Sequence, residues 1–244
     1  NIKRRYKILT GLFIALILLL LMIMHLLNTG SIQEKVIQSL TNKISEKYSV
    51  NISVNSSELS IEGGIILNDV LLNDHYNDTL IYINNLKTNL KSLDKILDGN
   101  VRFTNLQLKG LILNIKKYSN DQINSLQFFL NLVKSKRDTT KFLPIISTSF
   151  LKIQNSEIRL PNISESYKIF NLKSNNFIAG PDFVETSLID GNFEAFRIKN
   201  FSFKSDSFKY SGCSVLIDDY ILTSDQGKIS GNLRHPEQVL KLRI

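Results

Sequence analysis

Residues 101–116 read VRFTNLQLKGLILNIK, and apolar residues alternate with polar ones along much of this stretch. An alternation with a period of two is typical of a β-strand that has one apolar and one polar face. Lys109-Gly110 interrupts the alternation, because glycine marks a break within a strand pattern. The stretch therefore predicts two strand arms, Val101 to Leu108 and Leu111 to Ile115, joined at Lys109-Gly110.

The same period recurs on both sides of this stretch, in short segments separated by Gly, Asn, Asp and Pro. The segments before it are 50–54, 59–61, 65–72 and 80–83, and those after it are 150–153, 157–160, 170–177, 183–189, 193–203, 208–217 and 220–222. We therefore expect a mainly β chain built from many short strands.

A loose repeat accompanies the strands: an apolar residue, an asparagine two positions later, and a second apolar residue three positions after that. It occurs around Asn68, Asn105, Asn155 and Asn200. Asparagine tolerates left-handed backbone geometry, so it suits a bend or bulge between two strand arms. The recurrence favours stacked supersecondary units over one closed globule.

Two helices are expected. Ser31 and Glu34 fit a capping box, and apolar residues then recur at helical spacing through Lys47. We expect this amphipathic helix to cover the end of a sheet, and the alternative is a helix lying on a bilayer surface. A second, short helix is predicted over 124–134. Residues 92–98 indicate a helical turn, and residues 135–140 a mobile loop.

An apolar stretch precedes these elements. Residues 8–27 read ILTGLFIALILLLLMIMHLL, with Ile8, Leu12, Leu16, Leu20 and Leu27 along the predicted membrane anchor. At about 1.5 Å per residue such a helix crosses the hydrocarbon core of a bilayer. It is longer than a signal-peptide core and lacks a small-residue cleavage site, which favours an uncleaved anchor over a removable signal.

The charges before the anchor predict its direction. Lys3, Arg4, Arg5 and Lys7 supply half of the net charge of +8, and this end is expected to stay in the cytoplasm. The remaining charge is small and no basic run carries interleaved aromatics, so nucleic acid is not an expected partner. The predicted organisation is a cytoplasmic tip and anchor (1–30), an amphipathic helix with the first β-units (31–135), and further β-units (136–244).

Motifs of catalysis and cofactor binding are absent from the sequence, which contains no G-x-S-x-G, H-E-x-x-H, P-loop or G-x-G-x-x-G. Asp74, His75 and Asp78 contain metal-ligating groups, but a solvated loop is the preferred interpretation. We therefore expect neither enzymatic activity nor a cofactor or metal.

The apolar strand faces have two interpretations. In a sandwich the apolar faces meet and fill a core, whereas in an open, curved sheet they line a groove. An apolar groove attached to a membrane suits acyl chains, because each buried CH₂ contributes about 0.8 kcal/mol. The candidate lipid-facing residues, taken from alternating positions, are Ile66, Leu71, Phe103, Leu108, Leu111, Leu113, Ile153 and Ile158.

Three segments carry a resemblance to a known family. They are 65–74 (IILNDVLLND), 78–81 (DTLI), and 93–99 followed by 101–108 (VRFTNLQL). With the basic tip, anchor and amphipathic helix before them, they resemble the N-terminal part of the TamB-type translocation and assembly proteins of Bacteroidetes-like bacteria, within the AsmA-like superfamily. The resemblance covers residues 1–135 well and the remainder only as repeated strands.

The resemblance implies an elongated, repetitive β-sheet that is U-shaped in cross-section and has an apolar interior. It also implies an inner-membrane protein with its bulk in the periplasm, movement of phospholipid along the interior, and partnership with an outer-membrane barrel of the Omp85 type. The alternative function is a periplasmic scaffold that binds such a barrel through exposed strand edges and has no lipid conduit.

Overall fold

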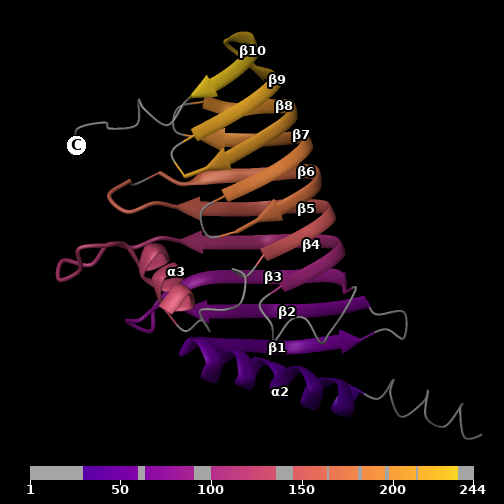
Figure 1. Ribbon diagram of the computed structural model, residues 1–244, viewed down its shortest axis with the longest axis vertical. Coiled ribbons are helices and arrows are strands. Elements are labelled where there is room, and N and C mark those ends of the chain that lie inside the picture. The colour runs from indigo at the N-terminus through magenta and orange to yellow at the C-terminus, as the bar shows by residue number, and fades with distance from the viewer. Residues whose placement is uncertain are drawn as a thin grey trace, which may run out of the picture.

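A computed structural model describes residues 30–59, 64–90, 100–135, 145–163, 165–180, 183–195, 198–212 and 214–235. Ten strands form one open sheet, accompanied by two helices in this part of the chain (Figure 1). The predicted mainly β class is confirmed.

The strands lie in the sheet in the order in which they occur in the chain. The elements are α2 (Gly30–Tyr48), β1 (Asn51–Leu59), β2 (Gly64–Asn73), β3 (Thr79–Leu90), β4 (Asn100–Asn114), α3 (Ser125–Ser135), β5 (Ile145–Arg159), β6 (Tyr167–Ala179), β7 (Phe183–Ala195), β8 (Ile198–Ser211), β9 (Ser214–Ser224) and β10 (Gly227–His235). All neighbours are antiparallel except β4 and β5, which are parallel. A parallel pair needs a long crossover, and residues 115–144 supply it.

Seven of the ten strands contain one interior residue with positive φ, where the strand bends. We call five of these residues the crease, namely Asp69, Gly110, Asn155, Leu188 and Asp219; the other two are Asn176 in β6 and Asn200 in β8. In β2 and β3 the pairs Asn68↔Asn85 and Val70↔Ile83 flank the crease, and Asp69 itself has no ladder partner. Figure 1 shows the result: the strands turn at one edge of the molecule, so the sheet folds back on itself.

The asparagine repeat predicts the bends in two of its four occurrences. Asn155 and Asn200 have φ of 48° and 56°. Asn68 and Asn105 do not have positive φ; the bend falls at the following residue, Asp69, in β2 and at Gly110 in β4. Asp also tolerates this geometry and Gly adopts it at least cost, so asparagine is not the only signal for a bend.

Several predicted strands have different limits in the structure. The arms on either side of Gly110 belong to one bent strand, β4, and the segments 150–153 and 157–160 both belong to β5. In contrast, predicted segment 193–203 spans the end of β7 and the start of β8, and 208–217 likewise spans β8 and β9. The strands are longer than predicted because a bend with a ladder on both sides does not end a strand.

Helix α2 confirms the first predicted helix and its position. It packs against β1 at the edge of the sheet, and Ile37 is buried there. A covered edge cannot pair with another chain, which protects the sheet at this end. Helix α3 confirms the second predicted helix, and Asn124 Oδ1 accepts a hydrogen bond from Gln127 N at 2.9 Å as its N-cap.

No helix among the described residues is long and apolar enough to cross a membrane. The predicted anchor at 8–27, with Ile8, Leu12, Leu16, Leu20 and Leu27, lies outside the described residues. The predicted helical turn at 92–98 also lies outside them, as does the predicted loop at 135–140 apart from Ser135, the last residue of α3.

Candidate functional site: the two faces of the folded sheet

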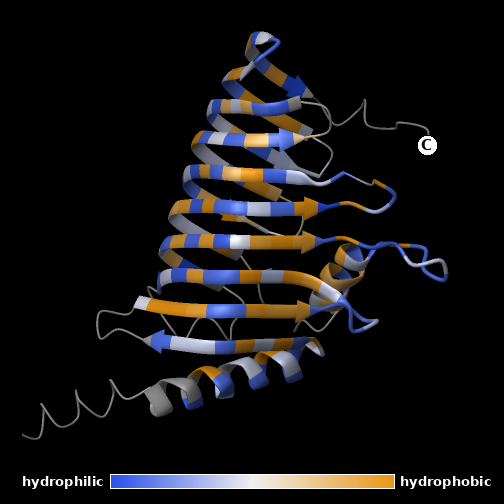
Figure 2. Cartoon of the chain, turned by 180° about the vertical axis from the view of Figure 1, so that it is seen from behind, coloured by the Kyte–Doolittle hydropathy of each residue, from blue (hydrophilic) through white to orange (hydrophobic). Residues whose placement is uncertain are grey.

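The crease divides the sheet into two arms. Arm A contains residues 64–68, 85–89, 106–109, 151–154 and 171–174, and arm B contains residues 70–72, 81–83, 111–113, 156–158 and 167–169. Directly paired residues point to the same side of a sheet, and successive residues point to opposite sides. The register therefore assigns each side chain to a face, and Figure 2 shows the hydropathy alternating along the strands.

One face of arm A is apolar. Leu86 pairs with Leu108, which pairs with Ile153, which in turn pairs with Leu172. The adjacent row on the same face contains Ile65, Thr88, Leu106, Leu151 and Ser174. We call this side of the sheet the apolar face.

Arm B continues the apolar face. One of its rows contains Val70, Ile83, Leu111, Ser156, Ile169 and Phe193, and the next contains Leu72, Ile81, Leu113, Ile158 and Tyr167. Phe193 also stacks on Phe201 of β8, with ring centroids 5.4 Å apart. The apolar character therefore extends across strands that are far apart in sequence.

Parts of the apolar face are shielded from water on both arms. Leu106 and Leu151 of arm A are 7% and 4% exposed, and Ile83 and Ile169 of arm B are 9% and 8% exposed. Within the described residues there is no second sheet to cover them. Other residues of the same face, such as Leu108, are only half-buried. The apolar face is thus enclosed by the fold but is not fully buried as a close-packed core is.

Six of the eight candidate lipid-facing residues lie with the apolar face. Leu108 and Ile153 belong to arm A, and Leu111, Leu113 and Ile158 belong to arm B. Phe103 pairs with Thr148, whose side chain is buried, so it also lies on the covered side.

Ile66 and Leu71 lie on the opposite, polar face, so the prediction that they share a face with the other six is wrong. Ile66 pairs with Lys87, and Leu71 pairs with Tyr82. The sequence pattern places the bend at Asn68, whereas it falls at Asp69. A shift of one residue moves the flanking side chains to the other face of a strand.

On the apolar side of the sheet, Ser and Thr hydroxyls form hydrogen bonds with backbone groups of the strands. The alternation of apolar and polar residues does not predict these buried hydroxyls. Thr88 Oγ1 donates to Asn105 O at 2.7 Å, and Ser156 Oγ accepts from Leu111 N at 3.1 Å. Ser205 Oγ lies 2.7 Å from Asp218 O. All three side chains are buried. These hydroxyls bond to backbone groups beside irregular positions, so a Ser or Thr on an apolar face is a usable signal for a bend.

The loop 74–78 and the crossover residues 116–128 form a polar and aromatic cluster at the ends of the strands. Tyr118 Oη lies 2.6 Å from Asp74 Oδ2 and 2.8 Å from Asp78 Oδ2. His75 Nε2 lies 2.7 Å from an Asp121 carboxylate oxygen, and the His75 ring stacks on Phe128. The carboxylates therefore engage protein donors, which orders the loop.

These contacts also change the ionisation of the cluster. The Lys116 ammonium, which lies 2.8 Å from Asp78 Oδ2, lowers the pKa of that carboxyl, and Tyr118 lowers it further. Burial and the two neighbouring carboxylates raise the pKa of Tyr118 well above its usual range, so its hydroxyl stays protonated and donates. In the part of the chain that the structure describes, no three His, Cys, Asp or Glu side chains are grouped to hold a metal ion.

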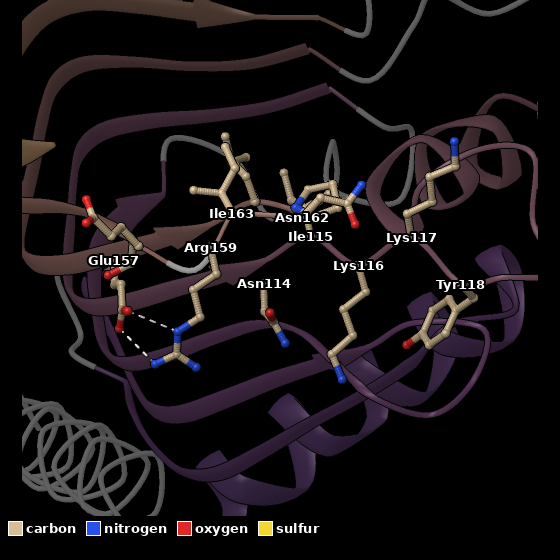
Figure 3. A pocket seen from close by; sticks show the side chains of 13 residues that line it. Asn114, Ile115, Lys116, Lys117, Tyr118, Glu157, Arg159, Asn162 and Ile163 are labelled. Atoms are coloured by element: carbon tan, nitrogen blue, oxygen red, sulfur yellow. Dashed lines mark hydrogen bonds and ion pairs between the residues drawn. The ribbon is translucent and has the colours of Figure 1, made fainter. Parts of the chain in front are cut away.

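A cavity of about 430 Å³ lies beside this cluster, between the ends of β4 and β5 and the loop that follows β5 (Figure 3). Asn114, Lys116 and Arg159 line it. Arg159 forms a bidentate ion pair with Glu157, at 2.8 and 3.0 Å, and Lys116 pairs with Asp78. Lys117 lines the cavity as a further cation, and Glu165 as a further acid. Two of the three cationic groups are therefore paired with protein carboxylates, which limits any electrostatic preference for an anion.

Comparison with known proteins identifies no relative: no family model, no curated protein and no solved structure matches the chain. Function must therefore be inferred from the faces of the sheet.

Proposed function

We propose that this chain is a membrane-anchored bridge protein of the cell envelope that carries phospholipid along the apolar face of its sheet. The supporting observation is the apolar face itself, which continues across both arms while many of its side chains stay only partly buried. A filled core would bury these side chains, whereas an interior with room for acyl chains leaves them accessible.

The finer architecture is part of this proposal. The folded sheet is U-shaped in cross-section, as in the AsmA-like and TamB-type proteins that the sequence resembles. Residues 8–27 anchor it in the inner membrane, with Lys3 to Lys7 in the cytoplasm and the sheet in the periplasm. Helix α2 begins at Gly30, so the first strands stay close to the membrane surface.

Photocrosslinking tests the proposal, because the register supplies matched positions on both faces. A photoreactive residue is placed at Leu108 or Ile158 on the apolar face, and at Ile66 or Leu71 on the polar face. In cells, we expect phospholipid adducts at the first two positions and few at the controls. Equal lipid labelling on both faces, or adducts to protein alone on the apolar face, would refute lipid transport.

A second candidate function is a periplasmic scaffold that binds an outer-membrane barrel of the Omp85 type. One observation favours it: the described part of the chain has no strand beyond β10, and Ile229 and Leu233 of that strand are 59% and 43% exposed. An unpaired strand edge can accept a strand from a partner. Co-purification of a barrel protein with no lipid bound to the sheet would favour this function over the first.

A further inference from the structure

The polar face of arm A has a composition that the rest of the sheet does not share. Across β3 to β6, one row contains Lys87, Gln107, Lys152 and Lys173, and the adjacent row contains Asn85, Lys109, Gln154 and Asn171. These eight residues, which we call the lysine face, comprise four lysines and four amides and include no acidic residue. With strands about 4.8 Å apart, each row is about 14 Å long.

None of the four lysines of this face forms an ion pair with an acidic side chain among the described residues. Lys87, Lys109 and Lys173 are exposed, and Lys152 is partly exposed. The nearest carboxylate in the same row belongs to Asp190, opposite Lys173, but it forms its ion pair with Lys204 at 3.2 Å. The face therefore presents an excess of positive charge to solvent, with Asp190 at its border.

The opposite arm shows that the same sheet can balance its charges. On the polar face of arm B, Glu157 pairs with Arg159 at 2.8 Å and Lys168 pairs with Glu194 at 2.9 Å. On arm A, by contrast, Lys152 and Lys173 are direct cross-strand neighbours. Like charges in that position destabilise a sheet. An unfavourable pair of this kind, with no compensating contact in the described part of the structure, is typical of a surface that is kept for binding.

We propose that the lysine face binds an acidic polysaccharide. Ammonium groups attract the acid groups of such a polymer, and the side-chain amides of Asn and Gln both donate and accept hydrogen bonds, as sugar hydroxyls require. The rows run across the strands along the length of the sheet, which suits a linear chain. Aromatic and arginine side chains, on which nucleic-acid bases stack, are missing from these eight positions.

This inference is independent of lipid transport, because the lysine face and the apolar face are opposite sides of the same strands. The test uses the full chain in an uncharged detergent and measures its binding to three soluble polymers. Alginate carries both carboxylates and hydroxyls, poly-L-glutamate carries carboxylates without sugar hydroxyls, and dextran carries hydroxyls without charge. We expect alginate to bind most tightly, with an affinity that falls as salt is added.

Replacing the four lysines together by glutamine should weaken alginate binding at least about tenfold, and replacing them by arginine should retain it. The matched control removes the same number of charges elsewhere, through Lys117→Gln, Lys199→Gln, Lys209→Gln and Lys228→Gln. That control should change the affinity less than about threefold. The circular dichroism spectrum of each variant checks that the sheet is intact.

Three results would overturn the proposal. Equal loss of binding in the control variant would show that only net charge matters. Poly-L-glutamate, anionic vesicles or duplex DNA binding as tightly as alginate would assign the surface to an acidic protein, a membrane or a nucleic acid. Equally strong binding of dextran would show that the lysines are not the recognition element.

Discussion

Replacing Gly110 by alanine tests the crease directly. Gly110 has φ of +65°, and a Cβ added there would lie 2.9 Å from the Cβ of Asn84 on the neighbouring strand. Left-handed geometry costs an L-residue about 1–2 kcal/mol. The close contact adds to this cost, because two strands joined by a ladder separate only with loss of hydrogen bonds. We expect Gly110→Ala to lower the free energy of unfolding by about 2–3 kcal/mol.

Gly231→Ala is the matched control. Gly231 also lies within a strand, but it has no positive φ, and an added Cβ would meet Tyr220 at 3.8 Å, an ordinary contact. Its replacement should change stability by less than about 0.5 kcal/mol. The double variant Gly110→Ala with Asn84→Gly removes the close contact and should recover only part of the loss.

The assay is urea unfolding followed by circular dichroism, with both variants measured beside the parent chain. If Gly110→Ala and Gly231→Ala have equal midpoints, the crease does not require a glycine and the expected cost of the bend is refuted. A full recovery in the double variant would show that the contact with Asn84, and not the backbone geometry, sets the cost.

Three further predictions concern the faces and the loop cluster. Leu151→Ala on the apolar face should cost about 2–4 kcal/mol by urea unfolding, and Leu71→Ala on the polar face less than about 1.5 kcal/mol; equal costs would contradict the assignment of faces. Ser156→Ala leaves the part-buried Leu111 N–H without its acceptor and should cost about 1–3 kcal/mol in the same assay, whereas an unchanged midpoint would show that the ladder readjusts. Lys116→Met removes the main cause of the lowered Asp78 pKa, so an NMR titration of that carboxyl should move up towards its ordinary value of 3.8. Because the folded pKa is depressed, the stabilisation by this contact is present above pH 3.8 and is lost as the pH falls through the folded pKa; an unmoved titration in the variant would contradict the assignment.

The class of the fold is predictable from periodicity alone, because strict alternation over segments such as 50–54 fits a half-buried strand and does not fit a helix. The first described helix is also predictable, from its capping box and helical spacing, and the second from helical spacing alone. The assignment of side chains to the two faces is harder to predict from the sequence, because it depends on the position of each bend. The bend at Asn155 is predicted at the right residue, and Ile153 and Ile158 on either side of it lie on the apolar face as expected. The bend predicted at Asn68 instead falls at Asp69, which places Ile66 and Leu71 on the polar face.

The lysine face could not be predicted from the sequence, for a related reason. Lys87, Lys109, Lys152 and Lys173 are dispersed over 87 residues of chain and form no basic run. Only the register brings them together, and the register between β4 and β5 depends on a crossover that no local pattern specifies. The buried hydroxyls become a signal only once the apolar face is known, because in the sequence a single Ser or Thr within a strand resembles an ordinary solvent-facing residue.

The order of the strands has a consequence for how the protein reaches its native state. Every strand pairs with the one made just before it, so each new strand can add to a sheet that is already present. Short connections make such pairings fast, because little loop entropy is lost. The exception is the parallel step from β4 to β5 across residues 115–144. Assembly should therefore proceed from the N-terminus as a growing stack, with this one crossover as the slowest addition.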